Sequence, residues 1–371
     1  MISIPLVDLR VQHREIEDEV RRGFDDVLAK SAFILGPPVA EFEAEFARFS
    51  GVEHCIGVAN GTDAVELALR AVGVGSGDEV ILPANTFIAS ALAVLRAGAR
   101  PVFVDADPVH HLIDVDQVVR AMGARTRAIL PVHLYGQLAD MERLQAIAAD
   151  AGISLVEDAA QCHGATRNGR AAGSLGALAA TSFYPAKNLG AYGDAGAVLT
   201  NEQAVAARLR CLRSYGSDQK NHHPEVGFNS RLDTLQAVVL LAKLKRLAGW
   251  NEQRRRAAAY YGALLADVDG IGLPKTLDGN EHAWHLYVVR VPERDRIVKA
   301  LSAVGIETGI HYPIPVHLQG AFSQLGHEPG DFPVSERAAE EVLSLPLYPG
   351  IREEQQMSVV EQLRKSLGET G

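Results

Sequence analysis

The strongest constraint on the fold is a regular alternation of short apolar segments with amphipathic helical segments over residues 55–158. The expected strands are 55–59, 79–83, 101–105, 127–132 and 153–158, and the expected helices are 62–72, 87–98 and 140–152. Parallel strands need long crossover connections, which are usually helices. The alternation therefore predicts an α/β protein whose mostly parallel sheet is buried between layers of helices.

The flanking segments predict a division into two domains. The expected elements are helices at 13–31 and 38–49, one long helix or two in series at 231–266, a strand at 285–291, a helix at 293–305 and a strand at 306–312. The later pattern differs from the first and is typical of a smaller α+β domain. We therefore expect a large domain over 1–249 and a small one over 250–371, packed closely because no flexible linker separates them.

The charge balance argues against a nucleic-acid partner. The 371 residues include 36 Lys and Arg against 46 Asp and Glu, a formal net charge of −10, whereas binding a phosphate backbone requires a basic face. Three widely spaced cysteines without a CxxC pair indicate a reduced, cytoplasmic protein. No apolar stretch is long enough to span a bilayer and no secretory signal is visible, so no membrane association is expected.

Three further patterns are better explained as structural. The glycines of GVGSGD (73–78) lie between a helix and a strand, the reverse of the order that a dinucleotide fingerprint requires. The histidine pairs at 110–111 and 222–223 lack the spacing of a closed metal site, so no metal is expected. Cys162 and His163 are adjacent and should point in different directions, which makes a nucleophile pair improbable.

Two segments carry possible site chemistry at the ends of predicted strands. In ANGTDA (59–64), Gly61 permits a tight turn and Thr62 opens a helix, so this turn is either an anion-binding cup or an ordinary helix cap. In ISLVEDAAQ (153–161), Glu157 and Asp158 should point to opposite faces of the sheet. One of them is expected to face a ligand at the carboxyl edge, and the pattern does not say which.

The segment TSFYPAKNLGAYGDAGAVLT (181–200) is the most informative. Lys187 stands alone among apolar and small residues, a setting in which a lysine shifts its pKa and suits Schiff-base chemistry. The surrounding glycines indicate that the backbone approaches another group closely. Most lysines are instead surface residues on loops, which is the alternative.

These three features together resemble the fold type I pyridoxal-phosphate (PLP) enzymes, which are aspartate aminotransferase-like. More narrowly, the chain resembles the DegT-type (DegT/DnrJ/StrS) aminotransferases that act on nucleotide-linked keto sugars. The resemblance covers nearly the whole chain and rests on motifs in the same order. They are PLVDL, NGTDA, HLYGQLADM (133–141), VEDAAQCHGA (156–165), FYPAKNLGAYGDAGA (183–197), LRSYGSDQK (212–220), GFNSRLDTLQA (227–237) and HYPIPVHLQ (311–319).

The resemblance implies PLP as the cofactor and Lys187 and Asp158 as the catalytic residues. Lys187 would hold PLP as a Schiff base and then move a proton, while Asp158 would keep the pyridine nitrogen protonated. The other implied cofactor contacts are Gly61, Thr62 and Ser182 at the phosphate, Gln161 near the phenolic oxygen, Phe87 stacked on the ring and Asn229.

The resemblance also implies a homodimer with shared active sites, because Asn229 would reach the phosphate of the partner's cofactor. Residues that match the substrate side are Tyr184, Lys220, His311 and Tyr312. Lys220 and its neighbouring histidines would supply positive charge for a diphosphate. A solvated loop explains these substrate-side residues equally well.

The implied function is a PLP-dependent transaminase of the EC 2.6.1 class. The form of the lysine segment is similar to the branch that aminates C3 of a nucleotide-linked, dTDP-type, 3-keto-6-deoxy sugar with L-glutamate as the donor. The alternatives are a C4-keto sugar or a cyclitol ketone as substrate, or a non-catalytic regulatory protein that binds PLP or a nucleotide sugar. A PLP-dependent sugar dehydratase would carry histidine in place of Lys187, and a dehydrogenase has only the pattern at 73–78 in its favour.

Overall fold

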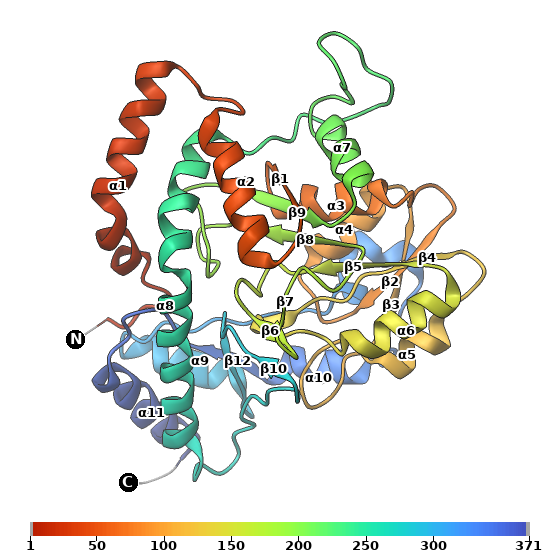
Figure 1. Ribbon diagram of the computed structural model, residues 1–371. Helices are drawn as coiled ribbons and strands as arrows, with labels where there is room; N and C mark the ends of the chain where they lie inside the picture. The colour runs from red at the N-terminus through yellow and green to blue at the C-terminus, as the bar shows by residue number, and fades with distance from the viewer. Residues whose placement is uncertain (1–2, 369–371) are drawn as a thin grey trace.

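A seven-stranded sheet forms the centre of the structure, a computed structural model that describes residues 3–368 (Figure 1). In spatial order its strands are β1 (His54–Val58), β9 (Gly196–Thr200), β8 (Leu178–Ser182), β5 (Ser154–Asp158), β4 (Thr126–Ile129), β2 (Glu79–Pro83) and β3 (Arg100–Val104). Strand β9 runs antiparallel to both of its neighbours, and the other pairings are parallel. The predicted α/β class with a mostly parallel sheet is confirmed.

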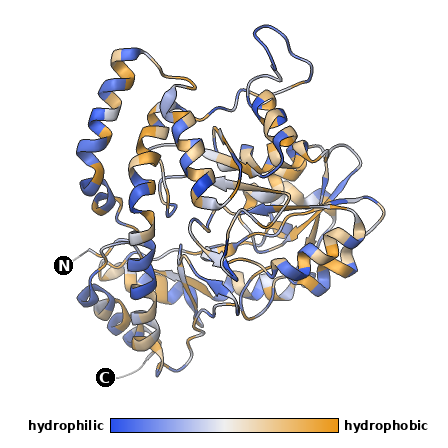
Figure 2. Ribbon diagram, viewed as in Figure 1, coloured by the Kyte–Doolittle hydropathy of each residue, from blue (hydrophilic) through white to orange (hydrophobic). Residues whose placement is uncertain are grey.

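Helices cover both faces of this sheet, which is why its strands are apolar along nearly their whole length. One face packs against α2 (Pro37–Ser50), α5 (Val115–Ala121), α6 (Met141–Ala151) and α8 (Thr234–Leu265). The other packs against α3 (Gly61–Ala71), α4 (Ile88–Arg96) and α7 (Gln203–Leu212). Figure 2 shows this contrast: the central strands are mainly white and orange, whereas the loop that extends beyond α7 is mainly blue.

A second apolar core lies around the C-terminal half of α8, which runs through residue 250 without a break. Its elements are β11 (Tyr287–Arg290), β12 (Val342–Leu345), α9 (Arg294–Ala303) and α11 (Glu353–Leu367). Helix α1 (Leu9–Lys30) packs along the other half of α8 (Figure 1), and β6 (Thr166–Arg167), β7 (Arg170–Ala171) and β10 (Asn280–Glu281) form a small separate sheet. The division at residue 250 stays a prediction.

Part of the C-terminal region returns to the large sheet. The segment with η2 (Val316–Leu318), η3 (Gly320–Leu325) and α10 (Pro333–Glu341) places Phe322 and Phe332 in the main core. The carboxylate of Asp105, one residue after β3, accepts hydrogen bonds from the N–H groups of Val334 and Ser335 at 2.8 Å each. This carboxylate caps the start of α10 and ties it to the sheet.

One expected element is wrong. Residues 306–312 do not form a strand; they make only single bridges, from Ile306 to Ile4 and from Gly309 to Ser344. The place beside β11 is taken by β12 instead. The glycine pattern at 73–78 is a turn between α3 and β2, as expected. Within residues 3–368, no helix combines the length and the apolar character needed to cross a bilayer.

Candidate active site

Lys187 lies in a tight loop that follows β8. The loop is closed by hydrogen bonds from the Lys187 N–H to the carbonyl of Tyr184 and from the Ala191 N–H to the carbonyl of Phe183, both 2.8 Å. Burial lowers the pKa of the Lys187 amine to about 8, although the nearby Asp158 carboxylate opposes this shift. A lysine with this pKa is partly neutral near physiological pH and can act as a nucleophile or base.

The Asp158 carboxylate lies at the carboxyl end of β5 and is held by α4. The Ser90 hydroxyl donates to Asp158 Oδ2 at 2.7 Å, and the Ala160 N–H donates to Oδ1 at 3.2 Å. The Ser90 hydroxyl is in turn 2.9 Å from the Thr86 hydroxyl. Asp158 is buried, so this network fixes the orientation of its carboxylate. The carboxylate is close enough to Lys187 to act on the pKa of its amine.

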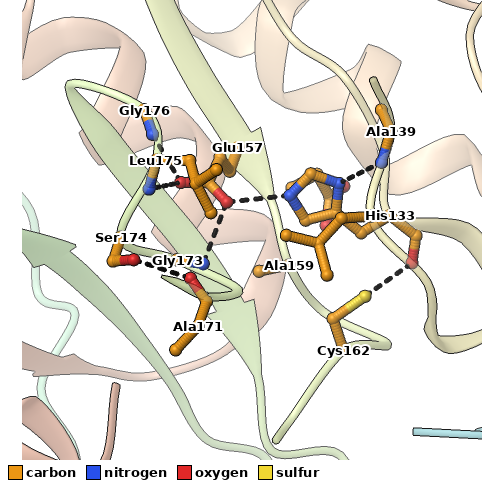
Figure 3. A network of polar contacts seen from close by, with 12 residues as sticks. His133, Ala139, Glu157, Ala159, Cys162, Ala171, Gly173, Ser174, Leu175 and Gly176 are labelled. Carbon is orange, nitrogen blue, oxygen red and sulfur yellow. Dashed lines mark hydrogen bonds and ion pairs between the residues drawn. The ribbon is translucent and has the colours of Figure 1, made fainter. Parts of the chain in front are cut away.

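Glu157 points to the other face of β5 and belongs to a separate network of polar contacts, which Figure 3 shows. Its carboxylate accepts hydrogen bonds from the N–H groups of Gly173, Leu175 and Gly176 and lies 2.8 Å from His133 Nε2. Because the Ala139 N–H donates to His133 Nδ1, the Nε2 atom carries the proton that is donated to Glu157. Burial alone would raise the pKa of Glu157, but these donors outweigh it and the pKa is lowered. Glu157 is therefore an internal anchor, and Asp158 faces the site.

The start of α3 presents free backbone N–H groups beside the end of β8. Asn60, not Thr62, is the N-cap, because its side chain accepts from the Asp63 N–H at 2.8 Å. A Cβ added to Gly61 would lie 2.5 Å from Ser182 Cβ, so only glycine allows this approach. Gly61, Thr62 and Ser182 therefore lie together at a helix N-terminus, an arrangement that suits an anion.

Aromatic and amide groups from distant segments of the chain meet around Gln161. The Tyr135 N–H donates to Gln161 Oε1 at 2.6 Å, and Gln161 Nε2 donates to the Tyr312 hydroxyl at 3.1 Å. The rings of Tyr312 and Phe87 have centroids 5.3 Å apart, and Phe87 is half exposed. His311 hydrogen-bonds through Nδ1 to Ser344, and burial together with Lys187 lowers its pKa to about 4.

The remaining predicted residues lie on the surface of the single chain. Asn229 is exposed, and its Oδ1 accepts from Arg231 at 2.6 Å. The adjacent Ser230 is buried and donates to Asp63 at 2.8 Å, which ties this loop to the start of α3. Tyr184 and Lys220 are exposed. The structure does not bring these two into the buried part of the site.

Several residues that shape the site were not predicted. Ser90 orients Asp158, and Tyr135 orients Gln161 from a backbone with φ of 62°. Asn188, directly after Lys187, donates to Asn251 and to the carbonyl of Ala283. The HLYG motif could have directed attention to Tyr135, because Gly136 follows it with φ of 115° and indicates a special turn. Within the part of the chain that the structure describes, no group of three or more metal-ligating side chains is found.

The family described as DegT/DnrJ/EryC1/StrS aminotransferase matches residues 14–364. The chain is 48% identical to the "Pleiotropic regulatory protein" of Geobacillus stearothermophilus, over 98% of both chains. It is 46% identical to the dTDP-3-amino-3,4,6-trideoxy-alpha-D-glucose transaminase of Streptomyces venezuelae, over 98% of this chain and 96% of that one.

A solved structure agrees over the full length. The X-ray crystal structure of S. venezuelae DesV in complex with ketimine intermediate covers 100% of both chains, with a TM-score of 0.97 and 45% sequence identity. The agreement includes the order of β-strands and helices around the lysine loop, since it extends over the entire chain.

Proposed function

Because the chain belongs to the DegT/DnrJ/EryC1/StrS aminotransferase family, we propose that it uses PLP to aminate C3 of a nucleotide-linked 3-keto-6-deoxy sugar. The amino donor in this proposal is L-glutamate and the nucleotide is dTDP. The observation that carries the proposal is the desolvated amine of Lys187, which experiences the charge of Asp158 at the ends of two neighbouring strands. The name and similarity of the S. venezuelae transaminase support the choice of substrate.

The described residues fit PLP in three respects. The N-terminus of α3, with Gly61 against Ser182, matches the charge and the close approach of a phosphate. Asp158 is a buried carboxylate that can pair with a protonated ring nitrogen. Phe87 offers an exposed aromatic face on which a flat ring can stack. When bound, PLP supplies an electron sink that stabilises negative charge on the carbon next to the transferred nitrogen.

The protein's own residues then bind, orient and move protons. Lys187 Nζ would hold the cofactor until the nitrogen of the amino donor displaces it. The released neutral amine would take a proton from the Cα atom of the donor and pass it to the cofactor, and in the second half of the reaction the ammonium form would deliver a proton to C3 of the sugar. Asp158, whose carboxylate is held by Ser90, would pair with the ring nitrogen of the cofactor. The oxygen of Gln161 accepts from Tyr135 and its amide group donates to Tyr312, so the remaining N–H of the amide would be available to the phenolic oxygen of the cofactor.

The proposal includes a homodimer. Asn229 is exposed in the single chain, while its neighbour Ser230 is fixed against the start of α3. Exposed apolar side chains at Phe33, Ile34 and Tyr192 lie near the start of α8 and offer a surface for a second copy. In this arrangement Asn229 contacts the partner's phosphate, and Tyr184, Lys220, His311 and Tyr312 line the path of the nucleotide sugar. The buried free thiols of Cys55, Cys162 and Cys211 support a reducing compartment, the cytoplasm.

A regulatory function without catalysis is the second candidate, favoured by the name of the G. stearothermophilus relative. Such a protein would not need a lysine whose pKa is lowered to about 8 beside a carboxylate. The presence of both groups therefore favours the enzyme.

The test is the visible absorption spectrum of the purified protein with PLP, before and after L-glutamate is added. The proposal expects a yellow lysine-bound band that bleaches with glutamate and returns with a dTDP-linked 3-keto sugar, but not with its 4-keto isomer. A Lys187→Ala variant should lack both the band and turnover. A protein that stays colourless with PLP would contradict the enzyme and support the regulatory candidate.

A further inference from the structure

One face of α8 carries three polar side chains that all contact the loop of Lys187. They are Gln236, Lys243 and Asn251, separated by seven and eight residues, which is about two helical turns in each case. Figure 1 shows α8 as the long helix that runs beside the sheet, and its residues take part in two apolar cores. The three side chains therefore lie along one side of α8.

Each of the three contacts holds a different residue of the loop. Gln236 Oε1 accepts a hydrogen bond from the Tyr192 N–H at 2.8 Å. Lys243 Nζ donates to the carbonyl of Gly190 at 2.6 Å. Asn251 Oδ1 accepts from Asn188 Nδ2 at 3.0 Å. Asn188 is adjacent to Lys187, so this contact between side chains restrains the backbone next to the lysine.

The middle contact is energetically unusual. The Lys243 side chain is 2% exposed, and no ion pair between Lys243 and a carboxylate is found in residues 3–368. Its ammonium group lies 5.1 Å from the centre of the Tyr192 ring, a cation–π distance. Burial lowers the pKa of Lys243 to about 8, and its charged form, with a carbonyl and a ring as partners, costs free energy that an apolar side chain would not. Packing alone therefore does not explain this lysine.

The loop itself depends on an external support. A Cβ on Gly190 would lie 2.2 Å from the carbonyl oxygen of Pro185, so the two ends of the turn around Lys187 are in contact through bare backbone. Internal hydrogen bonds close the turn, but they do not connect it to the rest of the protein. The hydrogen bonds that make this connection come from α8, from His13 of α1 at the Tyr192 hydroxyl and, through Asn188, from His285 and the carbonyl of Ala283.

We propose that Gln236, Lys243 and Asn251, here named the α8 clasp, are positioning residues. They fix the position and the orientation of the Lys187 side chain in the active site. The clasp acts through the loop backbone and touches no reacting atom. This inference rests on the proposed role of Lys187. The groups coupled electrostatically to Lys187 lie outside the clasp. Asp158 and Cys162 oppose the lowering of its pKa, and Lys187 in turn helps to lower the pKa of His163, His285 and His311.

Lys243→Met tests the clasp, because it keeps an unbranched side chain only one atom shorter and removes the donor to Gly190. Lys245→Met is the matched control, since Lys245 is on the same helix but is exposed and paired with Glu19. In protein without PLP, the rate at which Lys187 reacts with an acylating reagent is followed by mass spectrometry over a pH series. In protein with PLP, kcat and KM are measured separately.

The clasp predicts that K243M shifts the midpoint of Lys187 labelling upward by about one pH unit, because a loosened loop exposes the amine to water. It also predicts that kcat falls by about tenfold to a hundredfold while KM changes little, because misplacement affects the reacting geometry. K245M should match the wild type in both measurements. A K243M protein with a lower Tm but an unchanged midpoint and kcat would show that Lys243 only stabilises the fold, and would overturn the proposal.

A second variant keeps the test decisive if K243M does not fold. Gln236→Leu removes the acceptor for Tyr192 and leaves the buried ammonium in place, and it should shift the labelling midpoint in the same direction. An unchanged midpoint in Q236L overturns the clasp. Lys187→Ala separates this outcome from a failure of the proposed function: turnover in K187A would remove Lys187 from the mechanism, whereas inactive K187A with wild-type-like clasp variants would overturn the clasp alone.

Discussion

The carboxylates of Glu157 and Asp158 lie on opposite faces of β5, although the two residues are adjacent. Glu157 binds three backbone N–H groups and His133, whereas Asp158 binds Ser90 and acts on the charge of Lys187. The alternation of side chains along one strand thus directs one carboxylate into the interior and the other into the active site. Because the two residues are adjacent in one strand, the contacts of Glu157 also help to hold the backbone of Asp158 in place.

Glu157→Ala is predicted to lower the free energy of unfolding by about 3–5 kcal/mol, because His133 and three N–H groups are left without their buried partner. Urea unfolding of the protein without PLP measures this loss. Glu293→Ala is the control, since Glu293 pairs with Arg296 at the surface and should cost no more than about 1 kcal/mol. Equal effects of the two substitutions would contradict the role of Glu157 as an anchor.

Gly61→Ala is predicted to weaken PLP binding, because its Cβ would lie 2.5 Å from Ser182 Cβ and force α3 away from β8. Overpacking of this kind costs about 1–3 kcal/mol, which corresponds to at least a several-fold rise in the dissociation constant for PLP. Gly75→Ala provides the comparison, since an added Cβ there meets nothing within 4 Å. Fluorescence titration with PLP gives both constants, and an unchanged constant for G61A would remove the α3 terminus from the phosphate site.

The sequence predicts the strands of the main sheet correctly, but it does not predict which distant segments pair with one another. Apolar runs predicted β2 and β5 because a buried parallel strand needs no polar face. The segment 306–312 has the same composition as a strand, yet β12, from a later part of the chain, occupies the position beside β11. Pairing between distant segments depends on tertiary packing, which local pattern does not encode.

The same distinction holds within the site. Lys187 and Asp158 were expected because each stands in an unusual local context. Ser90 and Tyr135 were not, because their function follows from contacts with residues 68 and 26 positions away. The left-handed backbone of Tyr135 is likewise imposed by its surroundings.

The pKa of Lys187 predicts how the stability of the PLP-free protein depends on pH. In the folded state this pKa is about 8, below the ordinary value of 10.5, so between these values the unfolded chain binds a proton that the folded chain does not. Relative to Lys187→Met, the free energy of unfolding of the wild type should therefore rise with pH over this interval, by at most about 1.4 kcal/mol per unit. Urea unfolding of both proteins at each pH measures the difference. A difference that stays flat or falls would show that the amine is not desolvated.

Asn229 is predicted to complete the partner's active site, and mixed dimers can show this. Asn229→Ala and Lys187→Ala should each be inactive at low PLP concentration. In a mixed dimer, one site combines the intact Lys187 of one chain with the intact Asn229 of the other. An equal mixture in which chains exchange freely should therefore recover about a quarter of wild-type activity, since half of the dimers carry one complete site.

The control for this experiment is a mixture of Lys187→Ala with Asp158→Ala. Both residues act within one chain, as the effect of Asp158 on the Lys187 amine shows, so no mixed dimer contains a complete site and no activity should return. Recovery in the first mixture but not in the second would demonstrate a contact across the interface. If neither mixture recovers activity, although native mass spectrometry shows that the chains have exchanged, Asn229 acts within its own chain. Its hydrogen bond with Arg231 would then be a local contact of the loop.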